Sequence, residues 1–347
     1  MATGKKKEVQ EEDKKAVTAS QDYSLLGAID LPPTPTGVLP VDILLKGGIT
    51  PGMLYAVYSD SGVGKTTLIL SIAKKLIQYG DRVAFFDVEN GVSDDLRKKM
   101  GLFDNAGTDL NTSEFFFIKP RTYKQTWTAF KDVAAAGFKF VFIDSMTALS
   151  TADEIDGEPN NAIGLSARLD GDLYKNIKAL SFIERIATVV VQQKRIAAKG
   201  RFFVNDSAGG NASRFYPDAR IELTSGEKII TKKETINGKE EVVIGNNARI
   251  VTKKYRGGDN GISVPCPIIF GKGVLNSRFV LEVLRSNGYI NQGGAYFTIK
   301  VDGQDPVKAL GLVATMKEIS SKLDFYVDFL KSKNLLTLTQ GGEDDEV

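Results

Sequence analysis

A short segment, Ser61-Gly-Val-Gly-Lys-Thr-Thr67, constrains the fold more than any other part of the chain. Residues 54–58 before it are apolar and read as a buried strand, and residues 67–76 carry apolar side chains at helical spacing. Between such a strand and helix, glycines let backbone N–H groups surround phosphate oxygens. The segment therefore predicts a nucleotide phosphate site, with an ordinary Gly-rich turn as the alternative.

The predicted phosphate site covers the whole connection between strand and helix. It consists of Ser59, Asp60, Ser61, Gly62, Val63, Gly64, Lys65, Thr66 and Thr67. Lys65 is expected to reach the β/γ-phosphates and Thr66 to bind Mg²⁺. The full phosphate-loop pattern has glycine at the position of Ser59, where a left-handed backbone would cost serine roughly 1–2 kcal/mol.

The composition removes several classes of chemistry. The 347 residues include no histidine, which excludes Ser–His and Cys–His nucleophile pairs and histidine-based acid–base catalysis. Cys266 is the only cysteine, so no disulfide or thiolate metal cage forms within the chain. Any general base is then a carboxylate or a lysine. The net charge of +2 gives no overall attraction to polyanions, so affinity for DNA would come from local clusters.

The ends and apolar runs of the sequence bear on location. The first residues, Met1-Ala-Thr-Gly-Lys-Lys-Lys7, have no apolar segment behind them, which does not fit a secretory signal. No apolar run approaches the roughly 18 residues that a membrane-spanning helix needs. We therefore expect a cytoplasmic protein without a membrane partner.

Strand and helix patterns alternate through the middle of the chain. Strands are predicted at residues 82–87, 114–118, 138–144 and 187–193, and helices at 93–100, 123–136 and 165–185. Alternation of this kind indicates βαβ units, so the fold class is α/β, with a mostly parallel sheet covered by helices.

Outside this region the pattern changes. After residue 218 strands dominate, and residues 228–235 and 239–244 flank Asn237-Gly238, a strong hairpin signal. We divide the chain into a short amino-terminal segment (1–33), an ATPase-like core (34–275), a small α+β carboxy-terminal domain (276–335) and an acidic tail (336–347). Within the first segment, residues 23–29 form a candidate strand that is expected to pair with the edge strand at 115–118 of a second copy.

Polar residues follow three predicted strands, at the sheet edge where ligands bind in such folds. Asp144 ends one strand and is either a Mg²⁺-binding carboxylate or a cap of the next turn. Glu89 lies just past another, where a carboxylate could orient or activate water in a chain without histidine; spacing alone supports a structural role equally. Gln193 ends a third strand and, from the residues alone, is only a satisfied polar group.

Two basic stretches also carry alternatives. The segment from Arg195 to Ser207 combines cations with aromatics, and such a segment can bind the phosphates and unstacked bases of DNA. The alternative is a mobile loop whose phenylalanines fold onto the core. Lys253-Lys-Tyr-Arg256 reads without further information as the solvated basic face of a strand.

The chain resembles the bacterial RecA recombinase family over nearly its whole length. The segments that carry the resemblance are Thr36-Gly-Val-Leu-Pro-Val-Asp-Ile-Leu-Leu45, the phosphate loop, Phe86-Asp-Val-Glu89, Phe142-Ile-Asp-Ser-Met-Thr-Ala-Leu149, Ala152-Asp-Glu-Ile-Asp-Gly-Glu158, Gly164-Leu-Ser-Ala-Arg168, Gln192-Gln-Lys-Arg195 and Gly209-Gly-Asn-Ala212 with Phe215-Tyr216. The Gly-Gly-Asn-Ala segment, at this distance from the strand-end glutamine, is specific to the family.

The resemblance implies an ATP- and Mg²⁺-dependent recombinase that assembles as a helical filament on single-stranded DNA and pairs it with double-stranded DNA. It assigns Lys65 and Thr66 to phosphate and Mg²⁺, Asp144 to the metal and Glu89 to water activation. It further assigns Gln193 to sensing of the γ-phosphate, and Lys254 and Arg256 to the ATP site of the neighbouring subunit. The DNA contacts that it implies are Arg168, Arg195, Lys199, Arg201, Phe202, Phe203, Gly209, Gly210 and Asn211.

Three departures from the family pattern concern nucleotide recognition. Ser59 replaces the first loop glycine, Leu96 stands where the family has an aromatic against the adenine, and Ser93 replaces an acidic residue. Two other functional classes stay open: a ring-forming, helicase-like motor of the same superfamily, and an ATP-gated DNA-binding regulator without strand exchange. The divergence suits a bacteriophage enzyme acting in the bacterial cytosol.

Overall fold

The computed structural model describes residues 31–103, 110, 112–149, 162–199, 202–207, 210–235 and 238–336. The predicted strand at 23–29, the segment at 152–158 and the acidic tail beyond residue 336 lie outside these residues. Residues Pro33–Val347 group into one compact unit. Because the boundary near residue 276 falls within that unit, our division of the chain into four domains stays a prediction.

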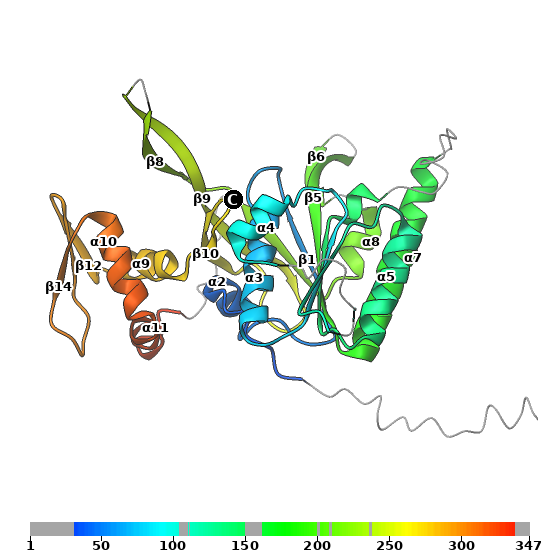
Figure 1. Ribbon diagram of the computed structural model, residues 1–347, viewed down its shortest axis with the longest axis horizontal. Helices are drawn as coiled ribbons and strands as arrows, with labels where there is room; N and C mark the ends of the chain where they lie inside the picture. The colour runs from blue at the N-terminus through cyan, green and yellow to red at the C-terminus, as the bar shows by residue number, and fades with distance from the viewer. Residues whose placement is uncertain are drawn as a thin grey trace, which may run out of the picture. The chain divides into compact units, whose positions relative to one another are not determined.

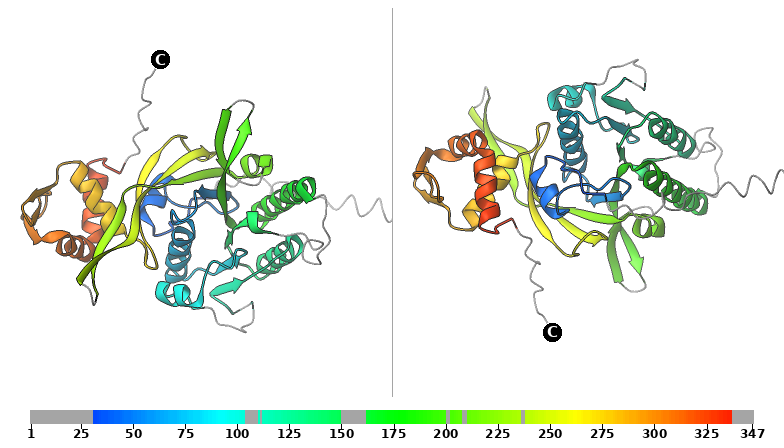
Figure 2. Two further views of the ribbon diagram at one scale, coloured as in Figure 1. Left: turned by 90° about the horizontal axis from the view of Figure 1, so that it is seen from above. Right: turned by 90° about the horizontal axis from the view of Figure 1, so that it is seen from below.

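A large mixed sheet forms the centre of this unit, with helices on both of its faces (Figures 1 and 2). Its strand order is β11-β10-β9-β7-β1-β5-β4-β2-β3, with β6 paired to β5 and β8 to β9. The strands are β1 (Leu54–Ser59), β2 (Val83–Asp87), β3 (Phe115–Ile118), β4 (Phe140–Asp144), β5 (Ala187–Lys199), β6 (Phe202–Ser207), β7 (Ala219–Thr224), β8 (Lys228–Thr235), β9 (Gly238–Tyr255), β10 (Ser263–Ile269) and β11 (Gly273–Val274).

The half of the sheet from β7 to β3 is parallel, and the half from β9 to β11 is antiparallel. The prediction of a mostly parallel, helix-covered α/β sheet is therefore confirmed for the core. β1, β2 and β4 are buried along their whole length, as expected for strands that are covered on both faces. β3 lies at one edge, where its backbone is open to pairing on one side.

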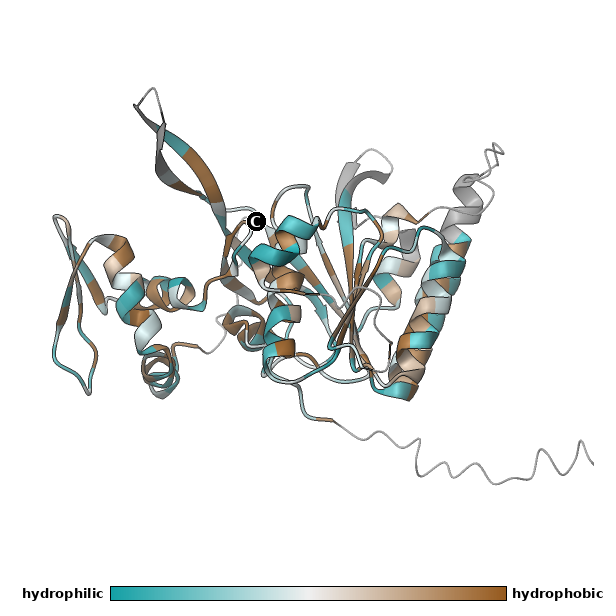
Figure 3. Cartoon of the chain, in the orientation of Figure 1, coloured by the Kyte–Doolittle hydropathy of each residue, from teal (hydrophilic) through white to brown (hydrophobic). Residues whose placement is uncertain are grey.

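The sheet separates the apolar interior into two layers, each covered by helices. The helices are α2 (Leu39–Leu44), α3 (Lys65–Gln78), α4 (Asp94–Met100), α5 (Tyr123–Ala135), the short 3₁₀ turn η2 (Met146–Ala148), α7 (Ala162–Glu184) and α8 (Gly210–Phe215). Helix α3 packs with one face of the sheet, and α5 and α7 pack with the other. Colouring by hydropathy shows hydrophobic strands inside and hydrophilic residues along the covering helices (Figure 3). Among the described residues, no helix is long and apolar enough to cross a membrane.

The segment after Gln193 differs from the loop that we expected there. β5 continues to Lys199 and pairs with β6 in an antiparallel hairpin, with Lys194 opposite Ser207 and Lys199 opposite Phe202. The physical reason is local: two stretches containing β-branched and aromatic residues are joined by a two-residue connection that begins with Gly200. The hairpin that the sequence predicts, β8–β9, is present, with Thr235 opposite Gly238.

The carboxy-terminal part is a small α+β arrangement, as the sequence predicts. It contains α9 (Asn276–Ser286), the antiparallel strands β12 (Ile290–Gly293), β13 (Tyr296–Ile299) and β14 (Val307–Leu310), and the helices α10 (Gly311–Ser321) and α11 (Leu323–Ser332). Asn276, the first residue of α9, joins it to the core. Its side chain accepts a hydrogen bond from the Leu39 backbone (3.1 Å) and donates one to the Gly37 carbonyl (2.9 Å).

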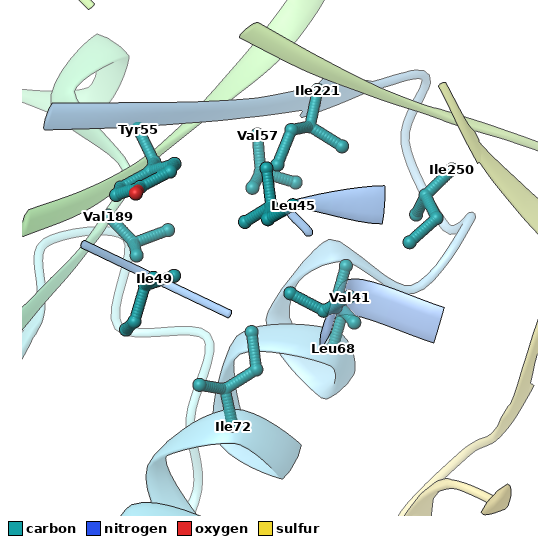
Figure 4. A pocket seen from close by; sticks show the side chains of 10 residues that line it. All are labelled: Val41, Leu45, Ile49, Tyr55, Val57, Leu68, Ile72, Val189, Ile221 and Ile250. Atoms are coloured by element: carbon teal, nitrogen blue, oxygen red, sulfur yellow. The ribbon is translucent and has the colours of Figure 1, made fainter. Parts of the chain in front are cut away.

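A void of about 10 Å³ lies between α3 and the sheet (Figure 4). Its lining consists of Val41, Leu45, Ile49, Tyr55, Val57, Leu68, Ile72, Val189, Ile221 and Ile250. Because the lining is apolar, a void of this size stays dry. Tyr55 brings the one hydroxyl among these side chains; it accepts a hydrogen bond from the Thr50 backbone (2.7 Å) and donates to the Met53 sulfur (3.4 Å).

We expect Tyr55→Phe to lower the free energy of unfolding by about 1–2 kcal/mol, because the half-buried Thr50 amide then loses its partner. Urea unfolding followed by circular dichroism measures the change. Tyr79→Phe is the control, since Tyr79 is 61% exposed and its change should stay within about 0.5 kcal/mol. Equal stability of Tyr55→Phe and the unmodified protein would contradict this assignment.

Candidate active site

The carboxyl ends of β1, β2 and β4 and the middle of β5 bring together the residues that we expect to bind phosphate and Mg²⁺ and to activate water. Ser59, at the end of β1, lies opposite Gln193 of β5, and Asp87, at the end of β2, lies opposite Asp144 of β4. Because β4 lies between β2 and β5, these strand ends form one continuous edge. This is the edge at which open α/β sheets bind ligands.

The phosphate loop is shaped by two glycines. Gly62 has φ 74° and Gly64 has φ 118°, both in the left-handed region that side chains avoid. A Cβ added at Gly64 would also approach the Ile268 side chain to 3.0 Å. Gly64 is the N-cap of α3, which begins at Lys65, two residues earlier than the sequence pattern predicts. The helix N-terminus therefore points its unpaired N–H groups and its positive dipole end at the loop.

The Lys65 ammonium is half-buried and surrounded by oxygen atoms of the loop. It donates to the Ser59 carbonyl (3.2 Å), the Ser59 hydroxyl (3.1 Å) and the Asp60 carbonyl (2.9 Å). Burial lowers the pKa of Lys65, although Asp144, Glu89 and Asp60 oppose that shift. A cation held in this position by neutral acceptors is available to phosphate oxygens, which are stronger acceptors.

Ser59 does not take the left-handed conformation that the glycine of the full pattern would allow. It is the last residue of β1, fully buried, and its backbone is extended. Its hydroxyl donates to the Asp60 carbonyl (2.7 Å) and accepts from Lys65. The expected strain of a serine at this position is therefore absent, and the side chain contributes a contact to Lys65 that glycine lacks.

Thr66 and Asp144 meet at the start of α3. The Thr66 hydroxyl donates to Asp144 Oδ2 at 2.6 Å. Asp144 is almost fully buried, and burial, aided by the charges of Glu89 and Asp87, raises its pKa to about 6 against the opposing hydrogen bond from Thr66. Its carboxylate contacts Thr66, whereas Ser145 occupies the N-cap of η2, so the capping alternative lacks support in the structure.

Two oxygen ligands of this kind fit Mg²⁺, which binds one or two protein groups and completes its shell with water and phosphate oxygens. Among the described residues there is no group of three or more His, Cys, Asp or Glu side chains that would suit a different metal. Thr66 and Asp144 therefore remain the candidate magnesium ligands.

Glu89 and Gln193 contact each other at the sheet edge. Gln193 Nε2 donates to Glu89 Oε1 at 3.2 Å, and the Ser145 hydroxyl donates to the same oxygen. Glu89 and Gln193 are both exposed at the sheet edge, so Gln193 is not a buried structural amide. Our reading of the sequence missed Ser145, although it directly follows Asp144 in a segment that carries the resemblance.

Asp87 stabilises the turn that carries Glu89. The Asp87 carboxylate accepts hydrogen bonds from the backbones of Gly91 (3.0 Å) and Val92 (3.2 Å). The backbones of Val88 and Glu89 donate to the Asp144 carbonyl, at 2.7 and 3.1 Å. These contacts tie the Glu89 turn to the end of β4, and so hold the Glu89 carboxylate next to the phosphate loop.

Lys254 and Arg256 lie away from this edge, level with the middle and the start of β1. The Arg256 guanidinium contacts Asp218 Oδ1 at 3.0 Å, and the Asp218 backbone donates to the Leu54 carbonyl at the start of β1. Lys254 lies opposite Arg220 and donates to the Phe215 carbonyl (2.9 Å). From Leu54 to Ser59 the strand spans about 16 Å, and from Ala56, which lies opposite Arg220, to Ser59 about 10 Å. The contacts of the two cations within the described residues are therefore with Asp218 and Phe215 and not with the phosphate loop.

The predicted DNA-contacting residues are gathered around the β5–β6 hairpin and the following helix. The main chain of Arg195 and Lys199 belongs to β5, that of Phe202 and Phe203 to β6, and that of Gly210 and Asn211 to the start of α8. Arg168 is exposed on α7. Arg201 and Gly209 lie outside the described residues.

Leu96 and Ser93, the departures that concern the adenine, have structural roles in α4. Ser93 is the N-cap of α4, and its hydroxyl accepts a hydrogen bond from the Leu96 backbone at 3.2 Å. The Leu96 side chain is partly buried against the core layer on the α3 side. A packing residue, Leu96, thus stands at the position of the family's aromatic, and a helix cap, Ser93, stands at the position of its acidic residue.

Comparison with known proteins gives one consistent result. A family model described as the RecA N-terminal domain matches residues 21–274. The protein RecA of Mannheimia haemolytica is 26% identical over 304 residues, which cover 86% of this chain and 78% of that protein. The proteins RecA of Syntrophus aciditrophicus and Borreliella afzelii are each 26% identical, over 274 and 284 residues, and cover 78% and 80% of this chain and 75% and 74% of their own lengths.

We expect Lys65→Ala to lower kcat/KM for ATP hydrolysis at least roughly 100-fold, because it removes the cation that faces the phosphates. Glu89→Gln should bind ATP normally and lose turnover. Steady-state ATPase assays and nucleotide titrations on the same samples separate the two effects. Lys74→Ala, which changes another lysine of α3, is the control. Hydrolysis by Glu89→Gln at the unmodified rate, with DNA present, would refute the water-activating role.

Proposed function

The chain belongs to the RecA family, and on this premise we propose that it is an ATP-dependent DNA recombinase. In this proposal it polymerises on single-stranded DNA, hydrolyses ATP to ADP and phosphate, and catalyses homologous pairing and strand exchange with double-stranded DNA. The observation that supports the proposal most is the arrangement of the ATP residues. The phosphate loop, Thr66, Asp144, Glu89 and Gln193 share one sheet edge, while Arg256 lies near the opposite end of β1 and Lys254 lies level with its middle.

In the proposed reaction each residue at the edge has one task. Lys65 and the N-terminal amides of α3 bind the phosphates, and Thr66 and Asp144 hold Mg²⁺, which supplies charge neutralisation when bound. Ser145 and Gln193 both donate to Oε1 of Glu89, and Glu89 orients the attacking water through its other carboxylate oxygen, Oε2. Asp87 supports this geometry through the turn at Gly91 and Val92.

The position of Lys254 and Arg256 suggests that they act on a neighbouring subunit. Arg256 is 57% exposed and lies about one strand length from the phosphate loop of its own chain. A cation supplied by a second subunit stabilises transition-state charge only after assembly. This would make ATP hydrolysis depend on the filament, and thereby on DNA.

The β5–β6 hairpin supports a role in DNA binding because it starts directly after Gln193. A cation- and aromatic-containing hairpin suits a phosphate backbone and unstacked bases. A change in the contact between Gln193 and the γ-phosphate would alter the point in β5 after which the strand enters the hairpin. For assembly, the exposed edge of β3 offers a strand-pairing surface, as we expect for residues 23–29 of a second copy. The proposed setting is the bacterial cytosol, with a bacteriophage gene as one source.

Electron microscopy tests the proposed function most directly. The protein is mixed with single-stranded DNA and a slowly hydrolysed ATP analogue. Helical filaments that pair and exchange a homologous duplex support the recombinase. Closed rings would instead indicate a helicase-like motor. DNA binding with neither assembly would indicate an ATP-gated regulator.

We expect Gln193→Ala to bind ATP nearly normally and to lose most of the ATP-induced gain in affinity for single-stranded DNA. A neutral amide hydrogen bond of about 1 kcal/mol per subunit, repeated along a filament, is sufficient for such a gain. Arg201→Ala and Phe203→Ala should weaken DNA binding with and without nucleotide. Titrations at fixed salt measure both effects. A full ATP-induced gain in Gln193→Ala would show that the nucleotide signal does not depend on this amide.

A further inference from the structure

Lys194 follows Gln193 on β5 but faces the opposite side of the sheet. Along this strand Val190 packs in the layer of α5 and α7, whereas Val191 packs in the layer of α3. Side chains alternate along a strand, so Lys194 lies on the α7 side and Gln193 on the α3 side. Lys194 therefore does not share the contact of Gln193 with Glu89.

The Lys194 ammonium lies between two carboxylates from different elements. It forms an ion pair with Glu222 of β7, and it approaches Asp60 Oδ2 of the phosphate loop to 3.8 Å. Lys194 is 14% exposed, whereas Asp60 is 75% exposed. The half-buried lysine is thus placed between an anchored carboxylate on the sheet and a carboxylate on the exposed loop.

Glu222 is anchored by a second lysine. Lys253 of β9 contacts Glu222 Oε2 at 3.1 Å, on the other oxygen from the one that Lys194 contacts. Burial would raise the pKa of the Glu222 carboxyl, but hydrogen bonds from Lys194 and Lys253 hold it below its ordinary value. Glu222 is 11% exposed, so its ion pairs are screened by water less than those of a surface residue.

The contacts of Asp60 connect this group of charges to the phosphate-binding lysine. The Asp60 carbonyl accepts a hydrogen bond from Lys65 (2.9 Å), while the Asp60 carboxylate faces Lys194. A continuous set of contacts therefore runs from Lys65 through Asp60 to Lys194, at the base of the β5–β6 hairpin.

We propose that Lys194 is a positioning residue that couples the phosphate loop to the hairpin through Asp60, with Glu222 as its fixed anchor. When phosphate oxygens replace the Asp60 carbonyl as the acceptor of the Lys65 hydrogen bond, the loop around Asp60 rearranges. The distances from the Lys194 ammonium to the Asp60 and Glu222 carboxylates then change. Because Lys194 is the residue from which the hairpin continues, this change shifts the hairpin. The role rests on the proposed function, since it concerns ATP-dependent binding of single-stranded DNA.

The test measures the ratio of single-stranded DNA affinities with and without a slowly hydrolysed ATP analogue, on the full chain at fixed salt. Lys194→Met should lower this ratio by about fivefold, the effect of one ion pair per subunit, and Asp60→Asn should lower it similarly. In the double variant the two losses should not add, because both changes remove the contact between Lys194 and Asp60. Lys194→Arg should restore most of the ratio, which a purely structural defect would not allow.

Lys253→Met is the matched control. It also removes a lysine from Glu222, but within the described residues the ion pair of Lys253 is with Glu222 and not with the phosphate loop. The ratio should therefore stay within about twofold of the unmodified protein. A ratio that is unchanged in Lys194→Met, or equally lowered in Lys253→Met, would overturn the role of Lys194 while leaving the recombinase proposal intact. Absence of any ATP-induced gain in the unmodified protein would overturn both. Thermal melts of each variant check that it is folded; if Lys194→Met does not fold, the ratios of Asp60→Asn and Lys194→Arg decide in its place.

Discussion

The pairing of β1 with β5 on one side and β7 on the other determines where the functional groups of this protein lie. The phosphate loop follows the carboxyl end of β1, so its position relative to Gln193 is set by the register of Ser59 opposite Gln193. On the other side of β1, Tyr58 lies opposite Glu222, so the anchor of Lys194 lies next to the start of the phosphate loop. A shift of this register by one residue would turn every side chain of β1 to the wrong face.

The same strands give the physical basis for our proposal that the ATP site is completed by a second subunit. Parallel strands deliver Thr66, Asp144, Glu89 and Gln193 to one edge, whereas Arg256 is bound to Asp218 near the start of β1. Exchange of the contacts of Lys65 from neutral loop oxygens to charged phosphate oxygens is favourable, because charge-assisted hydrogen bonds are stronger. Such an exchange frees the Asp60 carbonyl and gives a physical means of passing nucleotide binding to the hairpin.

The sequence was sufficient to predict elements whose pattern is local. The apolar runs of β1, β2 and β4, the helix after the phosphate loop and the β8–β9 hairpin are all present, with ends that differ by a few residues. The position of β7 beside β1 and the ion pair of Lys194 with Glu222 could not be read in this way, because each joins residues far apart in the chain. The extended backbone of Ser59 was missed because the phosphate-loop motif has glycine at that position. The β5–β6 hairpin was missed because the sequence Gly200-Arg201 is not one of the residue pairs that strongly favour a hairpin turn.

Complementation between two inactive variants tests the central claim that the ATP site is completed by a neighbouring subunit. Lys65→Ala lacks the phosphate-binding lysine, and Arg256→Ala lacks the cation that we assign to the adjacent site. Each variant alone should show little ATP hydrolysis on single-stranded DNA. Their mixture should recover activity, because some junctions pair an intact phosphate loop with an intact Arg256. Unmodified rates for Arg256→Ala alone, or no recovery in mixtures that co-assemble on DNA, would contradict the account.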